Sequence, residues 1–243
     1  MSPEQERTHV YVSHPLIRQN YIEFRKYQNS ISKVASNGNT LVILPTALGK
    51  TVISLLVCAE MLYNYRDKRI LVMAPSRPLV NQHTTSFVSA LKISEDNMAL
   101  LTGKLSPIER RAIWSKNLIR IVFATPEVVK NDIQNKRLLL ENFSLLVFDE
   151  AHRAVKDYAY VFVAREYFKQ SPDAMILALT ASPGSDKQKI TEICKNLLIE
   201  QVEYKNEDDK DVKPYINPID IAWKWFDLPL EYQYIRARLK DML

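Results

Sequence analysis

Residues 44–51 read LPTALGKT and end in a Gly-Lys-Thr set whose residue types can bind a phosphate chain. Phosphate binding needs backbone N–H groups at a helix N-terminus, a lysine such as Lys50 for the β- and γ-phosphates, and a hydroxyl such as that of Thr51 for Mg²⁺. The usual pattern also has an earlier glycine, at the place where this chain has Leu44, and Ala47 lies inside the turn. By itself the stretch fits either a phosphate-binding loop or a strand-to-helix turn that ends in these residues.

Two carboxylates follow a second apolar run. Asp149 and Glu150 lie in LLVFDEAH, residues 145–152, directly after the hydrophobic part. A carboxylate at the carboxyl end of a parallel strand lies where such sheets bind ligands, so Asp149 suits Mg²⁺ and Glu150 suits the attacking water. The structural alternative is a helix cap, with Asp149 capping and Glu150 favoured by the helix dipole. Together with Gly-Lys-Thr, the pair predicts a nucleoside-triphosphate site.

A third candidate is LTAS, residues 179–182, which follows another apolar run. Small hydroxyl residues such as Thr180 and Ser182 can contact neighbouring loops and a phosphate at this place. A plain helix cap explains them equally well.

The elements that must position these residues alternate regularly along the chain. Apolar runs nearly unbroken by polar residues are typical of parallel strands covered by helices on both faces. We predict such strands at 40–44, 69–74, 97–101, 120–124, 144–148 and 174–179. We predict helices between them at 50–64, 77–90, 106–115, 125–133, about 159–169 and 186–197. The alternation favours a doubly wound α/β fold.

The C-terminal part differs in pattern. Residues 206–211 are charged and predict a solvated loop, whereas 219–228 alternate in polarity and predict a half-exposed edge strand. Trp223 and Trp225 could stack on bases, but packing against apolar residues is the expected role. Residues 229–243 predict a helix that runs to the end of the chain. We expect one nucleotide-binding domain at 1–213, with 214–243 leading to a further domain.

Composition limits the alternatives. The chain has 243 residues and a formal net charge of +5, which permits a nucleic-acid partner without requiring one. No apolar run reaches the roughly 18 residues of a membrane span, and the N-terminus lacks an apolar signal core. We therefore expect an intracellular protein without a membrane partner. Cys58 and Cys194 are too few for a disulfide framework and predict buried thiols.

The ordered motifs resemble those of the first RecA-like domain of superfamily 2 helicases. The matching segments are LPTALGKT, APSRPLVNQH, LTGKLSP, ATPE, FDEAH and LTASPG. Three longer segments, IVFATPEVVKNDI, LLVFDEAHRAVKDYAYVFVARE and LTASPGSD, are similar more narrowly to the archaeal Hef helicase–nucleases and the Fanconi anaemia M translocases. The resemblance implies a RecA-like P-loop NTPase fold, with a mostly parallel sheet and helices on both faces, and ATP and Mg²⁺ as cofactors.

The resemblance also implies roles for individual residues. It assigns catalysis to Lys50, Asp149, Glu150 and His152, metal binding to Thr51 and Asp149, and coupling through His152 to Thr180 and Ser182. Nucleotide-binding positions are Arg25, Gln28, Thr46, Ala47, Leu48, Gly49, Lys50 and Thr51, with Gln28 matching a glutamine that reads the adenine edge. Nucleic-acid-binding positions are Ser76, Arg77, Gln82, Thr102, Gly103 and Thr125. Relatives usually have glycine at position 47, and alanine disfavours positive φ by roughly 1 kcal/mol.

The function implied is that of the N-terminal ATP-binding motor domain of an ATP-dependent DNA helicase or translocase, acting on forked or branched DNA in replication-fork repair. Expected partners are DNA, a second RecA-like domain, a nuclease domain and a sliding clamp. Because the second domain supplies an arginine for hydrolysis, we expect this chain to be nearly inactive alone. Two alternatives stand beside this hypothesis: an RNA-directed superfamily 2 ATPase, and a non-catalytic nucleotide-binding scaffold.

Overall fold

One seven-stranded sheet forms the centre of the molecule. The computed structural model describes residues 10–171, 173–181, 187–216, 223–227 and 229–240, and only the backbone of Ala47. All strand pairings among these residues are parallel. In spatial order the strands are β3 (Met98–Leu101), β4 (Ile121–Ala124), β2 (Arg69–Met73), β5 (Phe143–Phe148), β6 (Ile176–Thr180), β1 (Thr40–Ile43) and β7 (Gln201–Tyr204).

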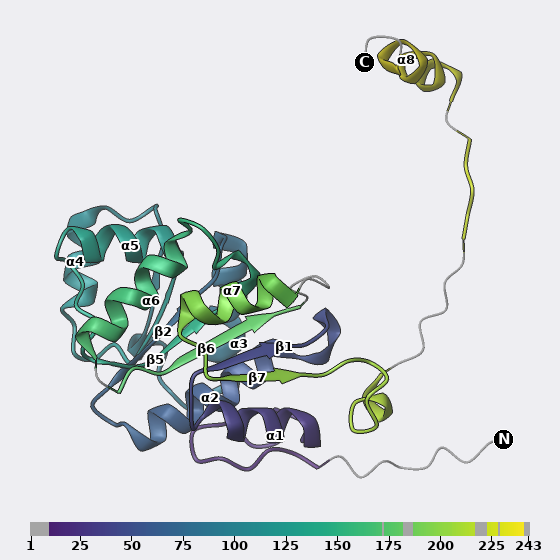
Figure 1. Cartoon of the computed structure of the whole chain (residues 1–243). Helices are drawn as coiled ribbons and strands as arrows, with labels where there is room; N and C mark the ends of the chain where they lie inside the picture. The colour runs from purple at the N-terminus through teal and green to yellow at the C-terminus, as the bar shows by residue number, and fades with distance from the viewer. Residues whose placement is uncertain (1–9, 172, 182–186, 217–222, 228, 241–243) are drawn as a thin grey trace.

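Helices cover both faces of the sheet, as Figure 1 shows. One face carries α1 (Lys26–Ala35), α2 (Lys50–Asn64) and α3 (Arg77–Ala90), and the other carries α4 (Pro107–Trp114), α5 (Pro126–Gln134), α6 (Ala159–Gln170) and α7 (Lys187–Leu197). Successive strand residues point to opposite faces, so Ile70 and Val72 join the first core while Leu71 joins the second. This arrangement confirms the predicted α/β fold.

The six strands predicted between residues 40 and 179 and the six helices predicted between residues 50 and 197 are all present, within two residues of the predicted bounds. Helix α1 is additional to these predictions, and so is strand β7. Its residues Gln201–Tyr204 are mostly exposed, and it pairs with β1 on one side only. An edge strand needs no continuous apolar run, and residues 201–204 have none that would predict a strand.

The described part of the C-terminal segment does not form the predicted edge strand, and Trp223 and Trp225 do not pack against apolar residues of the domain. Residues 223–227 belong to no strand, and the rest of the predicted 219–228 strand lies outside the described residues. Trp223 and Trp225 are 78% and 88% exposed and stack on each other, with ring centroids 6.4 Å apart. The helix predicted at 229–243 is present as α8 (Leu230–Lys240), which buries no residue and lies apart from the sheet. The tryptophans stay exposed because no described part of the chain covers them. The domain division at residue 213 remains a prediction.

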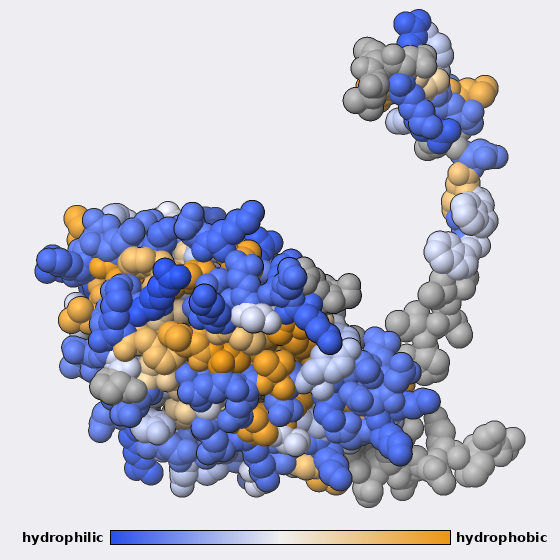
Figure 2. Space-filling model, in the orientation of Figure 1, coloured by the Kyte–Doolittle hydropathy of each residue, from blue (hydrophilic) through white to orange (hydrophobic). Residues whose placement is uncertain are grey.

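Polar and apolar residues are distributed as expected for such a domain. Figure 2 shows hydrophilic residues over the outer helix surfaces and an apolar band between the two helix layers. Cys58 is buried, as predicted, but Cys194 is only half-buried. Across the described part of the chain, no helix is long and apolar enough to span a bilayer.

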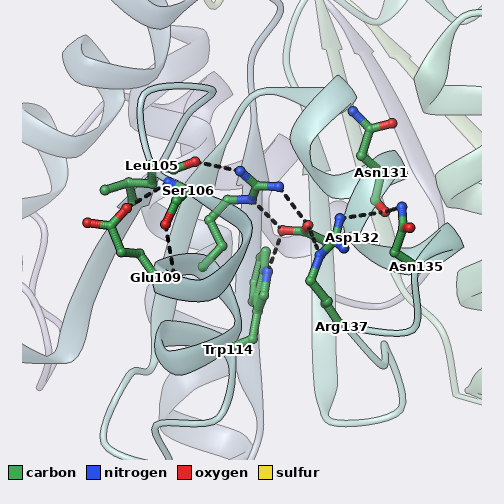
Figure 3. A network of polar contacts seen from close by, with 9 residues as sticks. Leu105, Ser106, Glu109, Trp114, Asn131, Asp132, Asn135 and Arg137 are labelled. Carbon is green, nitrogen blue, oxygen red and sulfur yellow. Dashed lines mark hydrogen bonds and ion pairs between the residues drawn. The ribbon is translucent and has the colours of Figure 1, made fainter.

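A buried ionic network joins α4 to α5, as Figure 3 shows. The carboxylate of Asp132 on α5 is fully buried. It accepts two hydrogen bonds from Arg110 of α4, at 2.8 and 2.9 Å, one from Trp114 Nε1 at 2.9 Å, and one from Arg137 Nε at 2.7 Å. Hydrogen bonds to a buried charge offset its desolvation. The network thus fixes the two helices whose first turns follow β3 and β4.

Candidate nucleotide and nucleic-acid site

The sheet brings the three predicted nucleotide segments together at its carboxyl-terminal edge, where the parallel strands end. Strands β5, β6 and β1 are neighbours, and Ile43 at the end of β1 is in register with Thr180 at the end of β6. Phe148 of β5 is in register with Ala178 of β6. Parallel strands end at the same edge, so the chain segments that follow these three strands lie side by side.

The phosphate-loop segment forms a short 3₁₀ turn followed by a helix. Thr46–Leu48 make the turn, Gly49 adopts φ 82° and ψ 45°, and α2 begins at Lys50. A Cβ atom on Gly49 would lie 2.4 Å from Gln28 Nε2. Glycine is therefore required both by the left-handed backbone and by the close approach of Gln28. Ala47 lies within the 3₁₀ turn, a conformation with negative φ that suits alanine.

The ammonium group of Lys50 lies inside this loop. Its Nζ donates to the carbonyl oxygen of Leu44 at 3.1 Å, and the residue is buried. Burial lowers the pKa of Lys50, an effect that the nearby carboxylates of Glu150 and Asp149 oppose. A phosphate bound here would replace the Leu44 carbonyl as the partner of Lys50.

Two residues of α1 hold the loop from the other side. Tyr27 Oη and Gln28 Nε2 both donate to the carbonyl oxygen of Leu48, at 2.8 and 3.1 Å. Gln28 is only 3% exposed, so it is an integral part of the loop's environment. Arg25 lies just before α1, where it bonds Glu23 at 3.3 Å and stacks over the ring of Tyr215. These contacts place Gln28 against the loop, whereas Arg25 contacts Glu23 and Tyr215 at the start of the same helix.

Asp149 is held by three elements. Its backbone N–H donates to Met73 O of β2 at 2.9 Å, and its backbone carbonyl accepts from Tyr160 Oη of α6 at 2.7 Å. Burial raises the pKa of Tyr160 well above its ordinary value, so the phenol remains a donor. The carboxylate Oδ2 lies 2.7 Å from His83 Nε2 of α3, and Oδ1 accepts from the Glu150 N–H at 2.9 Å. Neither His83 nor Tyr160 was a predicted site residue, although both lie in segments that carry the family resemblance.

Glu150 and His152 form a short chain toward β6. Glu150 adopts φ 53°, an uncommon conformation for a residue with a side chain. His152 Nδ1 lies 3.1 Å from Glu150 Oε2 and 3.2 Å from Thr180 Oγ1. Thus His152 bridges the predicted carboxylate and the predicted coupling segment. Ser182 lies outside the described residues.

The donor set fits Mg²⁺ with a triphosphate. Mg²⁺ prefers one or two protein oxygens, with water and phosphate oxygens completing its shell. Asp149 supplies a carboxylate whose two oxygens each accept one protein hydrogen bond and keep further acceptor capacity. Thr51, half-buried in the first turn of α2, supplies a hydroxyl. When bound, the ion would offset phosphate charge during transfer.

The predicted nucleic-acid residues lie along the other half of the same edge. Met73 of β2 and Leu101 of β3 are both in register with Ala124 of β4, so the segments after these strands are neighbours. Ser76, Arg77, Gln82 and Gly103 are exposed, Thr125 is half-buried and Thr102 is buried. The sheet therefore divides into a β5–β6–β1 half with the predicted nucleotide residues and a β3–β4–β2 half with the predicted nucleic-acid residues.

Comparison with known proteins decides the family. A family model described as DEAD/DEAH box helicase matches residues 25–190. The chain belongs to the DEAD/DEAH box helicases. Its likeness to a solved helicase is close: the crystal structure of the Pyrococcus furiosus Hef helicase domain matches with a TM-score of 0.81 and 42% identity, over 93% of this chain and 47% of that chain.

Two helicase relatives illustrate the range of similarity. A Methanocaldococcus jannaschii protein whose name assigns it to the ATP-dependent RNA helicases is 45% identical over 238 residues, covering 96% of this chain and 30% of the relative. The DEAD-box ATP-dependent DNA helicase Fancm of Drosophila melanogaster is 35% identical over 208 residues, covering 84% of this chain and 14% of the relative. The resemblance to Hef and Fanconi anaemia M helicases is thus confirmed. The chain spans less than a third of these two curated relatives.

Proposed function

We propose that this chain is the ATP-binding motor domain of a DNA helicase or translocase that acts on forked or branched DNA. The arrangement of one sheet edge carries the proposal. Lys50, Asp149 and Glu150 lie on its β5–β6–β1 half, beside exposed residues on the β3–β4–β2 half that suit a nucleic-acid backbone. In the intact protein we expect a second RecA-like domain, a nuclease domain and a sliding clamp as partners, in an intracellular setting.

The nucleotide step follows from the contacts of the loop. Lys50 exchanges the Leu44 carbonyl for the β- and γ-phosphate oxygens, and Thr51 with Asp149 holds Mg²⁺. Glu150 orients or deprotonates the attacking water. His152 bonds Glu150 and Thr180, so the position of the carboxylate is tied to the end of β6. An arginine from the second domain would complete the site, and little ATP should be hydrolysed without it.

The nucleic-acid step uses backbone groups. Arg77, Pro107 and Pro126 begin helices α3, α4 and α5 at the same edge, and helix N-termini present N–H groups to phosphates. Contacts of this kind position a strand without reading its sequence. That property suits a motor that must move along any sequence.

An RNA-directed ATPase is the second candidate, favoured by the name of the M. jannaschii relative. Phosphate contacts alone do not separate the two substrates, whereas a contact to the 2′-hydroxyl does. The name of the Drosophila relative supports DNA. Binding of single-stranded, duplex and forked DNA should be compared with RNA of the same sequence, on this chain and on the full-length protein. Tighter binding of forked DNA supports the proposal, and a clear preference for RNA contradicts it.

Calorimetry with Mg·ADP tests the nucleotide site directly. Lys50→Ala should weaken binding at least about tenfold, since it removes a charged partner of the phosphates. Lys169→Ala is the control, because Lys169 is an exposed lysine that pairs with Glu166 on α6. Unchanged ATP hydrolysis by the Lys50→Ala full-length protein would favour the scaffold alternative instead.

A further inference from the structure

His83 connects the two halves of the site. It lies on the buried face of α3, the helix whose first turn carries the exposed Arg77, and is 5% exposed. Its Nε2 is 2.7 Å from Asp149 Oδ2, the carboxylate at the end of β5. An ionised carboxylate only accepts hydrogen bonds, so Nε2 carries the proton and donates it. No motif assigned this residue a role.

The contact is shielded from water on both sides. The side chains of His83 and Asp149 are 6% and 10% exposed. His83 Nδ1 is also buried and has no hydrogen-bond partner among the described residues. An unsatisfied buried nitrogen costs free energy, so burying this ring for packing alone would be unfavourable relative to an apolar side chain. Among the described residues, the hydrogen bond to Asp149 is the one polar contact of the His83 side chain, and it offsets part of this cost.

His83 also restricts how Asp149 can turn. The carboxylate oxygens are each engaged once, by His83 at Oδ2 and by the Glu150 N–H at Oδ1. The hydrogen bond to Oδ1 comes from Glu150, the next residue in the chain. The hydrogen bond to Oδ2 comes from His83 on α3, the helix that follows β2. A shift of α3 therefore changes the position of Oδ2 directly.

We propose that His83 is a positioning residue that orients Asp149 for the metal and transmits the position of α3 to it. This inference rests on the proposed function of Asp149. Nucleic acid held at Arg77, in the first turn of α3, would thereby alter metal–nucleotide binding at Asp149. By reciprocity, the metal–nucleotide complex would alter nucleic-acid affinity by the same factor.

The first test compares ADP binding to this chain with Mg²⁺ and with EDTA. Outer contacts to a metal-binding group typically change metal affinity about 10-fold to 100-fold. His83→Leu should abolish most of the increase in affinity that Mg²⁺ confers and leave metal-free ADP binding unchanged, whereas His83→Gln should restore it, because an amide can donate to Oδ2. His14→Leu is the matched control, since His14 Nε2 lies 3.5 Å from a carboxylate, that of Glu60, away from this sheet edge.

The second test measures an oligonucleotide's Kd with and without Mg·ADP. We expect the ratio of the two values to differ from one in the wild-type chain and to approach one in His83→Leu, with recovery in His83→Gln. A wild-type ratio of one, or a ratio unchanged in His83→Leu, would overturn the inference. If wild-type ADP binding does not depend on Mg²⁺, it is instead the proposed metal site that fails.

A nucleotide-free readout covers the case in which His83→Leu does not fold. Long-range ¹H–¹⁵N spectra of the wild-type chain should show the proton of His83 on Nε2 in slow exchange with water. Asp149→Asn should shift that resonance and leave His14 unchanged. A rapidly exchanging Nε2 proton would contradict the contact itself.

Discussion

The side-chain amide of Gln28 donates a hydrogen bond to the carbonyl oxygen of Leu48 at 3.1 Å. The residue expected to read adenine is therefore bonded directly to the phosphate loop. Tyr27 Oη donates to the same oxygen at 2.8 Å. Two side chains of α1 thus hold one carbonyl group of the loop, and the expected role of Gln28 in adenine recognition leads to the first prediction.

Gln28→Ala should lower the preference for ADP over GDP by about fivefold to tenfold, the usual worth of one or two hydrogen bonds. Tyr27→Phe removes the other bond to Leu48 but no contact to a base, so it should weaken both nucleotides equally. Calorimetric titration of each variant with both nucleotides separates the two effects. An unchanged preference in Gln28→Ala would show that Gln28 serves the loop alone.

Gly49→Ala should destabilise the fold by about 1 kcal/mol or more, because L residues disfavour the left-handed backbone. The contact of its Cβ with Gln28 Nε2, at 2.4 Å, should add to that cost and disrupt nucleotide binding. Urea unfolding measures the change in the free energy of unfolding. Gly103→Ala is the control for stability, because no atom lies within 4 Å of its added Cβ. Equal unfolding midpoints for the two variants would contradict this expectation.

Ala47→Gly should preserve or tighten nucleotide binding. The 3₁₀ turn Thr46–Leu48 suits alanine, and glycine lets the loop leave this turn more readily when phosphate displaces the Leu44 carbonyl. The free energy of unfolding should fall by up to about 1 kcal/mol, since glycine makes the unfolded chain more flexible. Calorimetry and urea unfolding measure the two quantities. A clear loss of affinity for Mg·ADP would mean that alanine is fitted to the bound loop as well.

Asp132→Asn should destabilise the fold at pH 7 by about 3–5 kcal/mol, because it removes the charge that pairs with buried Arg110 and with Arg137. Asp211→Asn is the control: Asp211 pairs with Lys205 at the surface, and its loss should cost less than about 1 kcal/mol. Denaturant unfolding at pH 7 compares the two. A loss of under 1 kcal/mol in Asp132→Asn would contradict the importance of the network.

The lowered pKa of the Asp132 carboxylate should make the stability of the fold depend on pH. Burial alone would raise the pKa of Asp132, but hydrogen bonds from Arg110, Trp114 and Arg137 outweigh it and hold the pKa below its ordinary value. A lowered folded-state pKa gives stabilisation that is complete above the unfolded value of about 3.9 and is lost as the pH falls through the folded value. The wild-type advantage over Asp132→Asn should therefore be constant from pH 7 to about 5 and shrink below about 4. Unfolding midpoints measured across this range test the sign.

The sequence by itself determined the order of the buried strands, the helices between them, and the residue types that follow each strand. Apolar runs 40–44 and 144–148 became β1 and β5, and the Lys50 and Asp149 motifs follow those strands as predicted. These features depend on residues close in sequence, so the hydrophobic period and the spacing of the motif residues are enough to predict them. The family also follows from them, because the motifs recur in a fixed order.

Only the tertiary structure decided the contacts that hold the site. The bond from His83 to Asp149 joins residues on α3 and after β5, and Gln28 reaches Leu48 from a helix that precedes β1. Edge strand β7 lacks the apolar run that marks a buried strand and is fixed by pairing with β1. Each of these depends on how distant segments pack in space, which local hydrophobic patterns and residue spacing do not encode.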